Sequence, residues 1–156
     1  MNSLYNFTLI LHSWNRWIIL IAGLLAIILA IIALVNKQGY SKTNKITSLV
    51  FISSLHFQLV IGILLYFVLS PITLEALSNF GAAMKNSDIR YWAVEHSFVN
   101  IIAIIVAQVG SIVVRRKSTD PKKHKATLIW FGISIVLIIA MIPMGMMGVS
   151  RPWFRF

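Results

Sequence analysis

Residues 90–114 read RYWAVEHSFVNIIAIIVAQVGSIVV, and this stretch decides what kind of fold the chain can adopt. It opens with the ionisable side chains of Arg90, Glu95 and His96, and then runs from Ser97 to Val114 without a charge. An uncharged apolar run of this length can cross a bilayer as a helix. Ionisable groups at the mouth of such a run are costly to bury, so they indicate a functional site.

Three further apolar stretches accompany this one, and together they predict four membrane-spanning helices. A span needs about 20 predominantly apolar residues. The sequence predicts the helices at about 4–35, 46–69, 87–114 and 121–149. Four spans joined by short connections favour an all-α, up-down four-helix bundle in which the whole chain is a single membrane domain. The longest connection, 70–91, includes SPITLEALSNF, which could form a short interfacial helix.

Composition supports a membrane protein and argues against a nucleic-acid-binding one. Of the 156 residues, 58% are hydrophobic and only 12% are charged, whereas soluble domains are about a quarter charged. Mean hydropathy is +0.84. The net charge of +10 comes mostly from basic residues in short connections, where topology explains them better than nucleic acid does.

Those basic connections predict an orientation. Residues 36–45 hold three lysines, and residues 115–125 hold six Lys or Arg and one Asp. Basic connections stay in the cytoplasm, so we expect both termini and residues 70–91 to lie outside a bacterial-type inner membrane. An aromatic belt is expected near the outer helix ends, made by Trp14, Trp17, Tyr91, Trp92, Trp153 and Phe154.

The absence of cysteine restricts the possible cofactors. It excludes disulfides, iron–sulfur clusters, thiolate metal sites and covalent c-type haem attachment. Any haem must therefore be held non-covalently, most simply by histidine. The N-terminal stretch lacks a basic region followed by a small-residue cleavage site, so we expect no cleavable signal peptide.

Two histidines on diagonal helices of the predicted bundle fall at one depth. With a rise of about 1.5 Å per residue, His12 lies about 12 Å and His96 about 13 Å from the outer helix ends. Opposed histidines at one level are what a bis-histidine haem b requires. Small residues follow each histidine along its helix face: Gly23, Ala26 and Ala30 after His12, and Ala103, Ala107 and Gly110 after His96. They leave room either for a flat ligand or for close helix packing.

The remaining histidines divide into a candidate ligand and a surface residue. His56, near mid-bilayer, could ligate haem in place of His12 or His96, hydrogen-bond a propionate or a quinone, or be a buried structural histidine. His124 lies in the basic run KKHK and is expected to be solvated. A copper site made by His12, His96 and Met144 or Met146 is a less favoured alternative.

Charged and polar neighbours complete the candidate site. Arg16 and Arg90 could pair with haem propionates, and Asn100 shares the face of His96. Glu95 could pair with either arginine or carry protons to a quinol site. The competing interpretation is an interfacial ion pair with snorkelling arginine side chains.

Three segments carry a resemblance to a known family. LHSWNRW at 11–17, HFQLVIGILLYF at 56–67 and RYWAVEHSFVNIIAIIVAQVG at 90–110 resemble small four-helix cytochrome b-like integral membrane proteins, as does the terminal RPWF. The resemblance implies non-covalent haem b, a role that carries over onto His12, His56 and His96 in the matching motifs, and electron transfer near quinones or respiratory complexes. The general layout is also similar to that of membrane protoporphyrinogen oxidases.

These observations give one leading hypothesis and two rivals. The first is a haem b electron-transfer protein, linked to quinone or acting as a subunit of a respiratory-type complex. The second is a non-catalytic accessory subunit of a larger membrane complex. The third is a protoporphyrinogen oxidase-like enzyme. The expected partners are the lipid bilayer, other membrane protein subunits and quinone, and nucleic acid is not among them.

Overall fold

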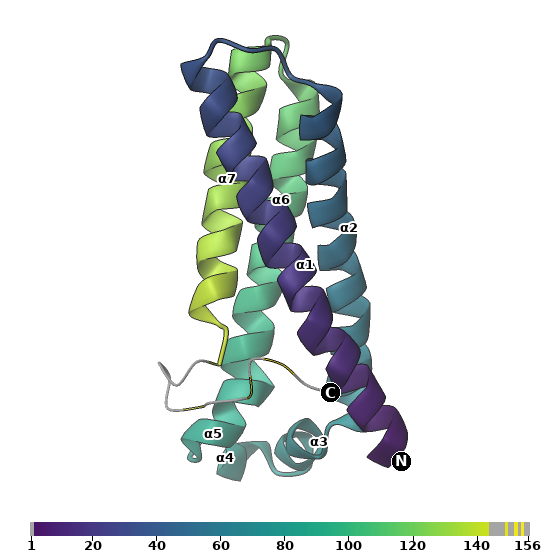
Figure 1. Ribbon diagram of the computed structural model, residues 1–156. Coiled ribbons are helices and arrows are strands. Elements are labelled where there is room, and N and C mark those ends of the chain that lie inside the picture. Colours follow the sequence, from purple (N-terminus) through teal and green to yellow (C-terminus); the bar gives the residue numbers. More distant parts are fainter. Residues whose placement is uncertain (1, 144–148, 150–151, 153, 155–156) are drawn as a thin grey trace.

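The computed structural model describes residues 2–143, 149, 152 and 154. The described residues form helices and no strands, which confirms the all-α prediction. Four segments are long and apolar enough to cross a membrane, so the chain is an integral membrane protein. The long helices run up and down as a bundle (Figure 1): α1 Asn2–Val35, α2 Lys42–Leu64, α6 His96–Arg116 and α7 Asp120–Ala140.

The bundle has two diagonals. Helix α1 packs along α2 and α7, and α6 packs along α7, whereas α2 and α6 approach each other over fewer residues. Helices α1 and α6 therefore oppose each other across the bundle. The core between them holds the tilted ring pair Phe51 and Phe131, whose centroids lie 4.9 Å apart.

Local signals in the chain set the tight connection between α1 and α2. Lys37 adopts a left-handed conformation (φ 55°), and the Gln38 N–H donates to the Ala33 carbonyl at 2.8 Å, as in a Schellman ending. Ser41 and Asn44 then form a reciprocal capping box at the start of α2. At the other connection Thr119 is the N-cap of α7, and Pro121 lies in the first turn, where its missing N–H is tolerated.

The opposite end is covered by short helices, which we call the cap (residues 70–95). Helix α2 continues as the π-helix η1 Leu65–Leu69 and stops before Pro71. The cap then contains α3 Pro71–Ser78, which confirms the predicted short helix, followed by α4 Phe80–Ala83, α5 Ser87–Arg90 and the π-helix η2 Tyr91–Glu95. The Tyr66 hydroxyl donates to the Ala93 carbonyl at 2.8 Å and ties η1 to η2.

Helix α7 ends earlier than the sequence predicted. Its last helical residue is Ala140, followed by a turn at Met141, rather than the expected end near residue 149. Pro143 accounts for the stop, because proline has no N–H and disfavours helical geometry at the residue before it. Residues 144–148 lie outside the described residues, and with them the copper alternative through Met144 or Met146.

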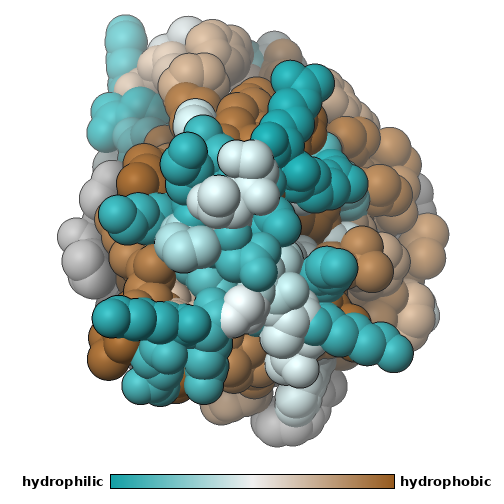
Figure 2. All heavy atoms as spheres, turned by 90° about the horizontal axis from the view of Figure 1, so that it is seen from above, coloured by the Kyte–Doolittle hydropathy of each residue, from teal (hydrophilic) through white to brown (hydrophobic). Residues whose placement is uncertain are grey.

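The two ends of the bundle differ in charge. The connections 36–41 and 117–119 lie together opposite the cap (Figure 1), and we call this the basic end. Viewed onto it, hydrophilic side chains gather over the face and hydrophobic ones surround the flanks (Figure 2). Nine Lys or Arg lie in or beside these connections, and Asp120 is the one acidic residue of 36–45 and 115–125.

Candidate functional site

A cavity of about 510 Å³ lies inside the cap half of the bundle. Its lining is mainly apolar and comes from α1, α2, α3, α6, both π-helices and the end of α7. Phe67 and Phe98 line it and are also 60% and 62% exposed, so they stand at its rim. The cavity therefore opens sideways where α2 and α6 separate, on a flank expected to face lipid.

His12 and His96 meet in this cavity, as the sequence predicted. Both line it, and their ring centroids are 6.3 Å apart with the planes inclined at 52°. They come from the diagonal helices α1 and α6, so each ring reaches inward from an opposite side of the bundle. No other pair of described histidine rings makes such a contact.

His96 is held by its surroundings at one ring nitrogen. Its Nδ1 lies 3.1 Å from the Met141 carbonyl oxygen, just past the last turn of α7. The rings of Trp92 and Tyr91 pack against it, with centroids 5.4 Å and 5.8 Å away. Asn100, which also lines the cavity, donates to the His96 carbonyl at 2.7 Å. These contacts fix the ring and leave its other nitrogen for the cavity.

His12 is positioned through its backbone. The Gln58 amide donates to the His12 carbonyl at 3.0 Å, and Asn15 donates to Gln58 Oε1 at 2.7 Å. The His12 ring faces α2 near Gly62, where an added Cβ would lie 3.9 Å from its Cε1. Its Nδ1 is buried and finds no hydrogen-bond partner among the described residues. Buried polar atoms in proteins are nearly always hydrogen-bonded, so a bound ligand could supply the partner of this nitrogen.

The predicted charged residues divide between the cavity and its edge. Arg16 lines the cavity, with its guanidinium 5.4 Å from the centre of the Trp17 ring. Arg90 and Glu95 instead pair with each other at 2.8 Å, and neither lines the cavity. The interfacial ion pair is therefore the observed arrangement for Arg90 and Glu95.

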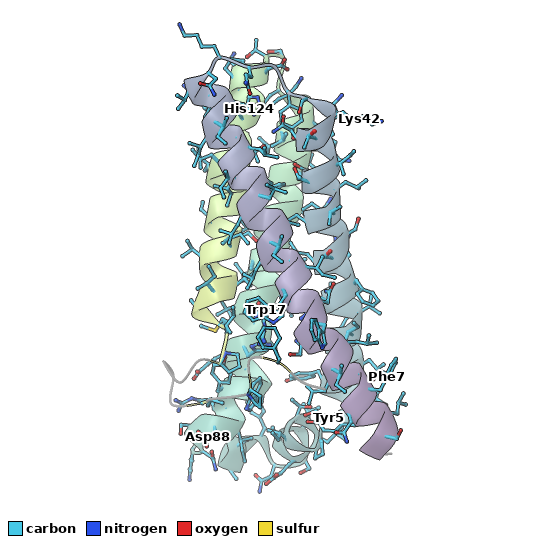
Figure 3. The ribbon with its side chains drawn as sticks, viewed as in Figure 1. Tyr5, Phe7, Trp17, Lys42, Asp88 and His124 are labelled. Atoms are coloured by element: carbon cyan, nitrogen blue, oxygen red, sulfur yellow. The ribbon has the colours of Figure 1, made fainter. Side chains whose placement is uncertain are left out.

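Figure 3 locates this region by its labelled side chains. Trp17, the neighbour of Arg16, lies in the cap half of the bundle, and Tyr5 and Asp88 lie near the cap itself.

His56 does not join the other two histidines. It is exposed on α2, on the same side as the exposed Val60 one turn further on. It does not line the cavity, even though the next residue but one, Gln58, does. The structure thus brings His12 and His96 together and leaves His56 on the outer surface.

His124 is not solvated, contrary to the expectation from its basic neighbours. Its side chain is 0% exposed, beneath the connection that leads into α2 (Figure 3). The Tyr40 ring packs against it at 5.1 Å, and neither ring nitrogen has a hydrogen-bond partner among the described residues. The basic side chains around it point outward, while the helix turn carries His124 inward.

The small residues along α1 and α6 serve helix packing. A Cβ added at Gly23 would lie 2.8 Å from the Phe51 ring, and one added at Gly110 would collide with Trp130. Ala26, Ala103 and their neighbours belong to the same packed core. The room for a ligand lies instead nearer the cap, beside Gly62 and Ala93.

The histidine pair has the spacing of two ligands on one metal ion. A metal–nitrogen bond of about 2 Å and an imidazole radius of about 1.2 Å place the centres of two opposed rings about 6.4 Å apart. The observed separation is 6.3 Å. Within the described residues no cluster of three or more His, Cys, Asp or Glu could hold a metal ion.

Several residues that build the site were not singled out from the sequence. Tyr91 was assigned to an interfacial belt, yet its side chain is 1% exposed and its hydroxyl donates to the Met141 carbonyl at 2.8 Å. Asn15 and Gln58 are the polar pair that joins α1 to α2. Their signal was present in the sequence, because an amide inside a membrane-spanning helix requires a partner.

Comparison of the chain with known protein families, with curated proteins and with solved structures finds no match.

Proposed function

We propose that this chain is a membrane electron-transfer protein that binds haem b non-covalently, with His12 and His96 as the axial ligands. The observation that carries the proposal is the 6.3 Å separation of these two rings across one apolar cavity. It matches two imidazoles bound on opposite sides of one iron. The absence of cysteine is consistent with non-covalent attachment.

The cavity supports a flat, largely apolar ligand. Its volume of about 510 Å³ lies within the range of cofactor sites, about 300–1,000 Å³. Haem supplies a one-electron couple when bound. The chain supplies the two ring nitrogens, an apolar wall that keeps water out, and the Arg16 guanidinium, which can pair with a carboxylate. The sideways opening gives a lipid-soluble quinol access to the edge of the site.

The proposed context is a larger assembly in a bacterial-type inner membrane, with the basic end in the cytoplasm.

The chain contains no cysteine, so a single introduced cysteine reports its own exposure. Lys117→Cys at the basic end and Lys85→Cys in the cap are a matched pair. An impermeant maleimide added to intact cells should label Lys85→Cys and spare Lys117→Cys. The reverse pattern would overturn the orientation.

The decisive experiment is a reduced-minus-oxidised spectrum of the purified protein, with three histidine variants. We expect a b-type α-band near about 560 nm that disappears in His12→Ala and in His96→Ala. His56→Ala is the matched control, because His56 is a histidine of the same bundle that lies outside the cavity. Its band should persist.

Two other outcomes would favour the rival functions. Folded wild-type protein with no band after haem supplementation would overturn the proposal and favour an accessory subunit. Turnover of a porphyrinogen without stable haem binding would favour the oxidase alternative.

A further inference from the structure

Tyr91 and His96 converge on one acceptor. The Tyr91 hydroxyl lies 2.8 Å, and His96 Nδ1 3.1 Å, from the same Met141 carbonyl oxygen. This carbonyl belongs to the C-cap of α7, where the helix has already ended. Carbonyls at a helix C-terminus lack intrahelical partners and carry the negative end of the helix dipole. Met141 therefore offers a strong acceptor to both donors.

The π-helix η2 makes this convergence possible. Tyr91 and His96 are five residues apart, which in an α-helix places two side chains about 140° apart around the axis. In η2 the His96 N–H instead bonds the Tyr91 carbonyl, an i→i+5 contact that brings both residues close to one face. The π-helical turn thus lets both side chains face the Met141 carbonyl.

The shared acceptor assigns the proton on the His96 ring. A carbonyl oxygen can only accept, so Nδ1 must carry the hydrogen in this bond. In the neutral ring Nε2 then presents a lone pair to the cavity. Asn100 does not compete for Nδ1, because its amide nitrogen is 3.5 Å from Nδ1 and donates to the His96 carbonyl at 2.7 Å.

We propose that the Met141 carbonyl sets the tautomer of His96, and that Tyr91 is a positioning residue that, through this shared carbonyl, sets the electron-donating strength of His96 as an iron ligand. This inference rests on the proposed haem site for its second part. The Tyr91 hydroxyl occupies part of the carbonyl's hydrogen-bonding capacity. Its removal leaves the carbonyl to draw more strongly on the His96 N–H, which gives the ring more imidazolate character and stabilises the oxidised iron.

The first test needs no haem. Ring ¹⁵N NMR of the haem-free protein, recorded at alkaline pH and assigned through His96→Gln, should show His96 protonated at Nδ1 and bare at Nε2. A proton found on Nε2 would overturn the proposal whatever the protein binds. In Tyr91→Phe the Nδ1 proton should stay in place and move to lower field, since its hydrogen bond becomes stronger.

The second test is the reduction potential of the haem-loaded protein. Tyr91→Phe should keep the b-type band with two histidine ligands and lower the midpoint potential. Tyr40→Phe is the control, because it removes a tyrosine hydroxyl that contacts Ser48 at the basic end, far from the cavity. An unchanged potential in Tyr91→Phe would overturn the tuning role. Failure of wild type to bind haem would instead overturn the proposed function and leave the tautomer result standing.

Discussion

The two halves of the bundle use similar residues for opposite purposes. In the half toward the basic end, which we call the packed half, Gly23 and Gly110 let helices touch and Phe51 fills the middle. In the cap half, α2 and α6 separate around a cavity, and small residues such as Gly62 border open space. In this bundle, a glycine therefore serves helix packing or borders the cavity according to its distance from the cap.

The histidines show the same division. His124 in the packed half is enclosed by protein, with Tyr40 against its ring, and it does not line the cavity between His12 and His96. His12 and His96 in the cap half face each other across usable space. Burial alone thus does not identify a histidine as a candidate metal ligand. His12 and His96 differ from His124 because they are buried, line a cavity and face each other.

The largest expected effect is on the packed half. Gly110→Leu should lower the free energy of unfolding by about 3 kcal/mol, because the new side chain must displace Trp130. Gly132→Leu is the matched control in α7, where a Cβ meets nothing within 4 Å. Unfolding in mixed detergent, followed by circular dichroism, measures both. Equal stability of the two variants would contradict close packing at Gly110.

The same substitution in the cap half should separate stability from binding. In Gly62→Leu an added Cβ lies 3.9 Å from His12 Cε1, an ordinary contact, so the fold should tolerate the change. The longer side chain would then fill the space beside His12. We expect wild-type stability with at least tenfold weaker haem binding by titration. Normal binding would show that the ligand lies elsewhere.

The next effect concerns the polar pair that joins α1 to α2. Asn15→Leu should cost about 2 kcal/mol of unfolding free energy, since it removes donors to the Ser54 carbonyl and to Gln58 and leaves buried acceptors unpaired. Thr47→Val is the control, because the Thr47 hydroxyl bonds only carbonyls of its own helix. Urea or detergent unfolding should show a clearly smaller loss for Thr47→Val. Losses of equal size would rule out a special role for the interhelical pair.

A smaller effect, of opposite sign, is expected at His124. His124→Leu roughly keeps the side-chain volume and removes two buried nitrogens without described partners, so stability should rise by about 1 kcal/mol. The haem band should be unchanged, because His124 lies at the opposite end from the cavity. A loss of stability would show that the buried nitrogens have a partner, such as water, that stabilises the fold.

The sequence predicted the arrangement of the spans well and the details of the site in part. Apolar length is averaged over many residues, so the bundle and the shared depth of His12 and His96 followed directly. The environments of Tyr91, His56 and His124 did not. Each depends on the rotation of one helix, and in η2 a single extra residue per turn redirects Tyr91 from the surface to Met141. Such a rotation leaves no trace in hydropathy.

The smallest expected effect is at the edge of the cavity, and it tests where the site ends. Arg90 and Glu95 form an ion pair with side chains 45% and 29% exposed, so solvent and salt screen the attraction. Glu95→Gln should therefore change the unfolding free energy by about 0.5 kcal/mol or less, and the change should shrink further at high salt. Haem affinity and potential should stay at wild-type values because neither residue lines the cavity. A large shift in potential would instead extend the site to Glu95, and with it the possibility that this carboxylate exchanges protons with a quinol at the rim.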